Sequence, residues 1–141
     1  MSWQEFEEKV RKVCEEHGFK TLFRHVFKDK LGKAEIDVVA ERGMILLCID
    51  AKLYSGHRYR VSQIKKEARK HVERCRRFSE VIGKKAIPVL ISFIDDALYF
   101  HEGCIIVPFD SFNAFLTEIY YYLAEFGYLG EKLKSSRSED L

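Results

Sequence analysis

The chain has 141 residues, of which 47% are hydrophobic and 33% are charged, and its formal net charge is +2 at pH 7. This composition is typical of a single soluble globular domain with a substantial core. No apolar run approaches the roughly 18 residues that span a bilayer, which excludes a transmembrane protein, and the chain does not open with a signal-peptide pattern. The four cysteines are widely spaced on apolar faces, which predicts buried free thiols in a reducing cytoplasm rather than disulfides or zinc ligands.

Charge is distributed very unevenly along the chain. Residues 1–51 carry 9 basic and 10 acidic side chains, residues 52–85 carry 12 and 3, and residues 86–141 carry 3 and 9. The three segments therefore have net charges of −1, +9 and −6. A basic segment of this kind suits a partner with a phosphate backbone.

The first third of the chain predicts one helix and three strands. Apolar residues at helical spacing predict a helix over residues 3–17, with Ser2 as its N-cap and Gly18 at its end. Residues 19–27 predict a strand, and a turn follows at 29–33. Two further strands, at 35–40 and 44–52, lie on either side of a turn at Glu41–Gly43.

A polar loop over residues 54–60 leads into a long helix, predicted over residues 62–82 and ended by Gly83. Its expected inner face consists of Val61, Ile64, Ala68, Val72, Cys75, Ser79 and Ile82. His71, on the same helix, and His101 are expected at the surface.

The last third predicts a strand at 85–93, a strand at 104–109 and a helix from Asp110 to about Phe126. Pro88 lacks an N–H group and argues for an edge or a bulge in its strand. We expect the tyrosine side chains at 120–122 to lie partly in the core and partly at its rim. A dimer surface is the alternative.

The predicted order is α-β-β-β-α-β-β-α, which gives an α/β fold with a mixed sheet flanked by helices. We predict one domain over residues 1–130 and a polar, flexible tail over 131–141.

The strand over residues 44–52 has an unusual end. Six apolar residues, Met44–Ile49, predict a fully buried strand, yet Asp50 and Lys52 follow directly. Side chains alternate along a strand, so these two charges point the same way. Buried charges are costly unless they are paired or bind a metal ion. With Asp37 on the preceding strand, this arrangement suggests a metal site with a cation beside it.

The register of the two strands decides whether the acids meet. A four-residue loop, Glu41–Met44, would place Asp37 opposite Cys48 and make Asp50 its diagonal neighbour on the same face, about 7–8 Å away. A loop that differs by one residue would put the two acids on opposite faces. We predict the four-residue loop.

Asp37, twelve intervening residues and then Asp50-Ala51-Lys52 resemble the signature of the PD-(D/E)XK, or restriction endonuclease-like, nuclease superfamily. The N-terminal pattern around Phe6-Glu7 and Gly18-Phe19 resembles the first helix of its Mrr-like branch. The element order agrees with this resemblance over residues 3–126. The resemblance implies a metal-dependent nuclease of restriction or DNA repair.

The resemblance implies that Asp37, Asp50 and Glu7 hold the metal ion, with the backbone carbonyl of Ala51 as a further ligand. Mg²⁺ suits a sparse set of oxygen ligands, and Mn²⁺ can substitute for it. Lys52 would orient the attacking water or stabilise the pentavalent phosphate. Glu35, which shares a face with Asp37, is a backup ligand.

The sequence departs from its relatives at several positions. Ile36 replaces the proline before the first acid, and the second acid is Asp50 rather than the commoner glutamate. Gln63 begins the basic helix, but position 67 is glutamate, so the Gln-x-x-x-Tyr motif of RecB-type exonucleases is absent. This favours an endonuclease.

The basic helix is expected to bind DNA beside the site. The candidate contacts are Arg58, Arg60, Lys65, Lys66, Arg69 and Lys70. A solvated charged face is the alternative. The aromatic and basic residues of the loop before this helix either touch the DNA backbone or only fill the loop.

The leading interpretation is therefore a cytoplasmic, Mg²⁺-dependent deoxyribonuclease directed by DNA structure rather than sequence, with a homodimer as an open alternative to a monomer. A Holliday junction resolvase is a close variant. A non-catalytic nucleic-acid-binding or interaction module with the same fold is the alternative from another class.

Overall fold

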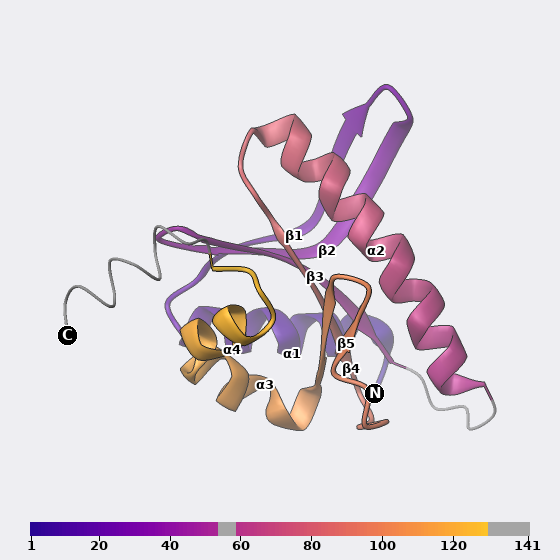
Figure 1. Cartoon of the computed structure of the whole chain (residues 1–141), viewed down its shortest axis with the longest axis vertical. Coiled ribbons are helices and arrows are strands. Elements are labelled where there is room, and N and C mark those ends of the chain that lie inside the picture. Colours follow the sequence, from indigo (N-terminus) through magenta and orange to yellow (C-terminus); the bar gives the residue numbers. More distant parts are fainter. Residues whose placement is uncertain (54–58, 130–141) are drawn as a thin grey trace.

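A six-stranded mixed sheet forms the centre of the computed structural model, which describes residues 1–53 and 59–129 (Figure 1). The strands are β1 (Lys20–Asp29), β2 (Gly32–Arg42), β3 (Ile45–Lys52), β4 (Ile87–Ser92), β5 (Phe100–His101) and β6 (Cys104–Pro108), in the spatial order β1-β2-β3-β4-β6-β5. Neighbours β1, β2 and β3 are antiparallel, whereas β3, β4 and β6 are parallel. The predicted mixed sheet is confirmed.

Helices cover both faces of this sheet (Figure 1). On one face lie α1 (Trp3–Glu16), α3 (Phe109–Thr117) and α4 (Ile119–Glu125), whose buried side chains share one core with β3, β4 and β6. The opposite face is covered by α2 (Arg60–Ile82), which packs on smaller clusters around Cys48 and Leu90. The sheet is therefore buried on both sides, which explains the unbroken apolar run of β3.

The ends of α1 and α2 follow from the sequence. Ser2 Oγ accepts a hydrogen bond from the backbone N–H of Glu5 at 3.1 Å and so caps α1. Gly83 adopts a left-handed conformation, with φ +71°, directly after α2. Both predicted helix limits are confirmed to within two residues.

The inner face of α2 differs from the prediction. Val61 and Ile82 are exposed, and the buried residues of the helix are Ile64, Ala68, His71, Cys75 and Phe78. Phe78 packs against the rings of His25 and Phe27 on β1, at 5.5 and 5.4 Å between centroids. This large aromatic contact rotates the helix toward Phe78 and His71, so the surface position predicted for His71 was wrong.

Three further predictions need correction. Pro88 lies on a central strand rather than at an edge; it is tolerated because the β4–β6 ladder begins only at Val89. The predicted helix at 110–126 is divided at Glu118, whose backbone is not helical, and it begins at Phe109 after an N-cap at Pro108. The short strand β5 was not predicted.

All four cysteines are buried and free, as predicted. In the part of the chain that the structure describes, no helix is long and apolar enough to cross a membrane. The predicted tail, residues 131–141, and the predicted DNA contact Arg58 lie outside the described residues.

Candidate active site

The hairpin of β2 and β3 places Asp37 and Asp50 at directly opposite positions. Val38 pairs with Ile49 and Arg42 with Ile45, so only Gly43 and Met44 form the loop. Continuing this register by one residue sets Asp37 against Asp50. Gly43 has φ +59° at the first position of the turn, as two-residue hairpin loops of type II′ require.

The predicted four-residue loop was therefore wrong by two residues. A shift of two preserves which side chains share a face, so the predicted same-face arrangement of the acids is confirmed. The acids are direct rather than diagonal neighbours, which brings them closer than predicted.

The two carboxyl groups share a proton. Burial, a hydrogen bond with Asp50 and its negative charge raise the pKa of Asp37 to about 8. Asp37 also accepts a hydrogen bond from the backbone N–H of Ala51, at 3.0 Å from Oδ2. At neutral pH Asp37 therefore carries the proton and donates a hydrogen bond to the ionised Asp50.

Asp50 is only 3% exposed and is surrounded by positive charge. Its Oδ2 lies 3.3 Å from Lys52 Nζ and 4.0 Å from Arg74 Nη1, yet this buried atom has no hydrogen-bond partner among the residues that the structure describes. Burial alone would raise the pKa of Asp50; the interaction with His71, the hydrogen bond with Asp37 and the charges of Lys52 and Arg74 outweigh burial and lower it. Asp50 is the ionised member of the pair.

Helix α2 contributes three residues that the sequence interpretation missed: Glu67, His71 and Arg74. Glu67 Oε2 lies 3.5 Å from Lys52 Nζ, so Lys52 is shared between two carboxylates. Glu67, His71 and Arg74 are spaced four and three residues apart along α2, which places them on one side of the helix. This spacing was the feature of the sequence that could have identified them.

His71 is fully buried beneath the acid pair. Its Nε2 lies 2.8 Å from the carbonyl oxygen of Cys48, and Arg74 Nη1 lies 3.1 Å from Nδ1. Because a carbonyl accepts and a guanidinium donates, the neutral ring carries its proton on Nε2. Burial lowers the pKa of His71, which keeps the ring neutral. The ring thereby fixes Arg74 beside Asp50.

Glu7 lies on the other side of the sheet, on α1. It is 4% exposed and accepts a hydrogen bond from Arg24 Nε at 3.2 Å. Its negative charge contributes to the raised pKa of Asp37, so it lies within electrostatic reach of the acid pair. Arg24 was not singled out from the sequence.

The other described candidate residues lie on β2 and α2. Glu35 is exposed on β2, and Gln63 is exposed on α2 with its Nε2 3.5 Å from Glu67 Oε1. The predicted DNA contacts Lys66, Arg69 and Lys70 are exposed on α2, and Lys65 is half-buried. Arg60 donates to both carboxylate oxygens of Asp96, at 2.7 and 2.8 Å. Their contact with DNA stays a prediction.

The acid pair fits a divalent cation. Among the described residues, no cluster of three or more histidine, cysteine, aspartate or glutamate side chains is arranged as a metal site. Two carboxylates with a neighbouring backbone carbonyl are nevertheless sufficient for Mg²⁺, which keeps several water ligands. A cation would also provide a partner for the unsatisfied Oδ2 of Asp50 and replace the shared proton.

We expect Asp37 to make the metal-free protein less stable as the pH rises from about 4 to about 8. Its pKa is raised from 3.8 to about 8, so the folded protein holds a proton that the unfolded chain has released. This stabilisation is lost as the pH rises through 8. The lowered pKa values of Asp50 and His71 act in the opposite sense, below their ordinary values of 3.8 and 6.5.

Urea unfolding of the wild type and of Asp37→Asn, at about pH 5 and about pH 8.5, isolates this effect. The decline in the free energy of unfolding should be smaller in Asp37→Asn. Equal declines would contradict the raised pKa.

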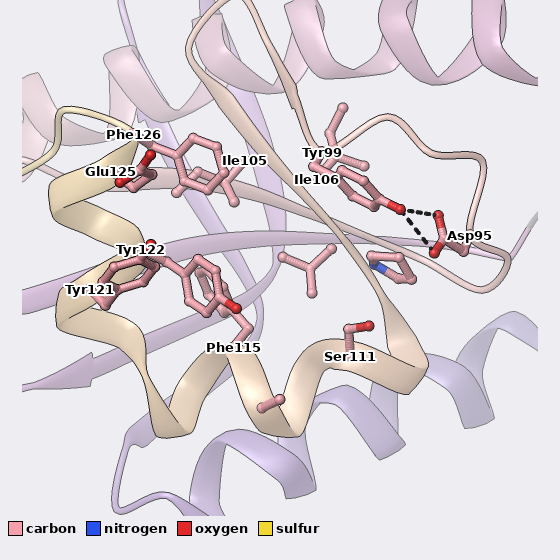
Figure 2. A pocket seen from close by; sticks show the side chains of 13 residues that line it. Asp95, Tyr99, Ile105, Ile106, Ser111, Phe115, Tyr121, Tyr122, Glu125 and Phe126 are labelled. Atoms are coloured by element: carbon pink, nitrogen blue, oxygen red, sulfur yellow. Dashed lines mark hydrogen bonds between the residues drawn. The ribbon is translucent and has the colours of Figure 1, made fainter.

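A groove of about 440 Å³ lies between β6 and the helices α3 and α4 (Figure 2). Tyr99, Phe115, Tyr122 and Phe126 line it, and Tyr99 donates hydrogen bonds to Asp95 at its rim. Tyr122 stacks on Phe115 at 5.5 Å, while Tyr121 is 60% exposed. No predicted site residue lines this groove, so it is separate from the acid pair.

Comparison with known proteins identifies the family. No family model matches the chain. A UPF0102 protein of Thermotoga petrophila is 30% identical over 94 residues, which cover 67% of this chain and 84% of the relative. The chain belongs to the UPF0102 family. A second relative, an uncharacterised protein of Archaeoglobus fulgidus, is 64% identical over 129 residues, which cover 92% of this chain and all of the relative.

The fold of this UPF0102 protein also matches a solved structure. The small subunit of the heterodimeric restriction endonuclease R.BspD6I superposes with a TM-score of 0.56 over 93% of this chain and 75% of that subunit, at 17% identity. The predicted restriction endonuclease-like fold is therefore confirmed. At this identity the match concerns the fold alone.

Proposed function

We propose that this protein is a metal-dependent deoxyribonuclease that hydrolyses DNA phosphodiester bonds. The observation that carries the proposal is the hydrogen-bonded pair Asp37 and Asp50 on the neighbouring strands β2 and β3, with the ammonium group of Lys52 3.3 Å from Asp50. Two acids and a lysine on two neighbouring interior strands match the chemistry that phosphodiester hydrolysis needs. The Phe6-Glu7 pattern of α1 supports the Mrr-like branch as part of this proposal.

Asp37, Asp50 and the Ala51 carbonyl would hold Mg²⁺ or Mn²⁺, and Glu7 would reach its water shell. The bound ion supplies Lewis-acid stabilisation of the phosphate and a water of lowered pKa. Asp37 would give up its shared proton on loading, and Lys52 would stabilise the negative charge that develops on the phosphate. Glu67 would hold the Lys52 side chain in position while no substrate is bound.

The exposed lysines and arginine of α2, Lys66, Arg69 and Lys70, would contact the phosphate backbone. Phosphate contacts orient DNA without reading its sequence, which supports structure-directed cleavage. Glu67, at the position where RecB-type exonucleases have tyrosine, supports endonucleolytic action. The buried free thiols support a reducing, cytoplasmic compartment.

One acid pair cuts one DNA strand at a time. For cleavage of both strands we therefore propose a homodimer with one acid pair in each subunit. The structural neighbour is itself one subunit of a heterodimeric restriction endonuclease.

The test is a cleavage assay of the wild type on supercoiled plasmid, linear duplex, a four-way junction and single-stranded DNA. We expect internal cuts with Mg²⁺ or Mn²⁺ and none with a chelator. Linearised plasmid would support a dimer, and nicked plasmid a monomer. Cleavage confined to the four-way junction would instead indicate a junction resolvase. DNA binding without cleavage under every metal condition would indicate a non-catalytic module.

A further inference from the structure

A stack of alternating aromatic rings and guanidinium groups joins α1 to β1. Arg24 Cζ lies 5.1 Å from the centre of the Trp3 ring and 4.8 Å from that of Phe23. Arg11 Cζ lies 4.8 Å from the same Phe23 ring. The order of the layers is therefore Trp3, Arg24, Phe23, Arg11. Such planes are the surfaces on which proteins stack nucleobases.

The backbone of Arg24 is strained to build this stack. Its φ is +51°, which non-glycine residues rarely adopt, in the middle of β1. The β1–β2 ladder pairs Phe23 with Val38 and His25 with Ile36, so the position of Arg24 faces that of Asp37 without pairing. The strain thus occurs beside the first acid of the site and directs the arginine toward α1.

The stack is connected to the acid pair through Glu7. Arg24 Nε binds Glu7 Oε1 at 3.2 Å, and the charge of Glu7 acts on Asp37. Trp3 lies one helical turn before Glu7 on the same side of α1. The layers therefore begin next to the proposed metal ligands.

The stack is open at its outer end. Trp3 is 53% exposed, although large aromatic side chains are usually covered. A second exposed ring, Phe93, lies at the other side of the site: its N–H donates to the carbonyl of Lys52 at 3.2 Å, and its ring meets Phe6 edge to face at 5.8 Å. The start of α1 and the carboxyl end of β3 lie toward the same end of the molecule in Figure 1.

We propose that Trp3, extended by Arg24 and Phe23, binds an unpaired nucleobase beside the scissile phosphate, so that the substrate is DNA with a single-stranded segment. This rests on the proposed nuclease function and specifies its substrate class. In an intact duplex the base faces are already stacked, so only an unpaired base can add a layer to Trp3. The positive charge of Arg24 suits the adjoining phosphates.

Trp3 is the only tryptophan of the chain, so its fluorescence reports directly on this site. The full-length protein is titrated, in chelator, with an oligothymidylate, with an abasic oligonucleotide of equal length, and with the matching duplex. We expect the oligothymidylate to quench the fluorescence and the other two to leave it largely unchanged. Quenching by all three to the same extent would overturn the proposal, because phosphates alone would then account for it.

Substitutions test the same point with a labelled oligothymidylate followed by anisotropy. Trp3→Leu should raise its Kd about 5- to 150-fold, the range that corresponds to the stacking of one base. Trp3→Phe should recover most of the affinity because the ring is retained. Tyr121→Leu removes another exposed aromatic ring, on α4 at the groove that no predicted site residue lines, and should change nothing. An unchanged Kd for folded Trp3→Leu would overturn the proposal.

The two proposals fail separately. If the Mg²⁺-loaded protein cleaves duplex DNA but single strands do not quench its fluorescence, the stacking site is contradicted and the nuclease function is supported. If single strands quench the fluorescence but no DNA is cleaved, the stacking site is supported and the nuclease function is contradicted.

Discussion

Asp50→Asn is expected to reduce DNA hydrolysis by about 10³-fold or more while DNA binding survives. A bound metal ion contributes several kcal/mol to the transition state, and each ~1.4 kcal/mol is a factor of ten in rate. Asparagine keeps the shape of the side chain but removes the ionised carboxylate of the pair. Cleavage rates at saturating Mg²⁺ and binding measured in chelator check both halves of the prediction.

The fold should tolerate this change. Asparagine keeps one oxygen that can accept the hydrogen bond from Asp37, and Lys52 retains Glu67 at 3.5 Å. Asp110→Asn is the matched control, because this exposed acid on α3 carries the same charge away from the acid pair. If Asp50→Asn cleaved DNA as fast as Asp110→Asn, the acid pair would have no role in DNA hydrolysis.

Lys52→Met is expected to reduce the cleavage rate by about 10²- to 10³-fold, the usual loss when one group that stabilises transition-state charge is removed. Metal binding should persist or tighten, since a positive charge 3.3 Å from Asp50 is removed. Lys52→Arg should not restore the rate, because a planar guanidinium does not reproduce a compact ammonium charge.

Single-turnover rates and metal titrations of the same variants separate these effects. Lys30→Met, in the exposed turn between β1 and β2, is the control for loss of one lysine charge. A loss of metal affinity in Lys52→Met that matches its loss of rate would argue against a role for Lys52 in transition-state stabilisation.

Much of this site could be predicted from the sequence because its signals are local. An apolar strand that ends in Asp50 and Lys52 is recognisable from alternation alone, and so is the shared face of Asp37 and Asp50. The exact register was not predictable in this way, since loops of two and four residues satisfy the same alternation. Gly43 at the turn favoured the shorter loop.

The residues from α2 depend on contacts between distant segments. Helical periodicity places His71 at the border of the apolar face, and hydrogen bonds with the carbonyl of Cys48 and the guanidinium of Arg74 make its burial favourable. Glu67 was noted only as a departure from a tyrosine motif, whereas its contact with Lys52 arises from how α2 packs on β3. Arg24 gave no signal, because nothing in a β-forming segment predicts a positive φ.

The most direct test of the account is a calorimetric titration of Mn²⁺ into the wild type and Asp50→Asn at pH 7. We predict one Mn²⁺ site per chain in the wild type and loss of this site in Asp50→Asn. Because Asp37 has a pKa of about 8, binding should also release a proton, which is visible as a dependence of the heat on the buffer. Absence of saturable binding to the wild type, or equal binding to Asp50→Asn, would contradict the assignment of Asp37 and Asp50 as a metal-dependent nuclease site.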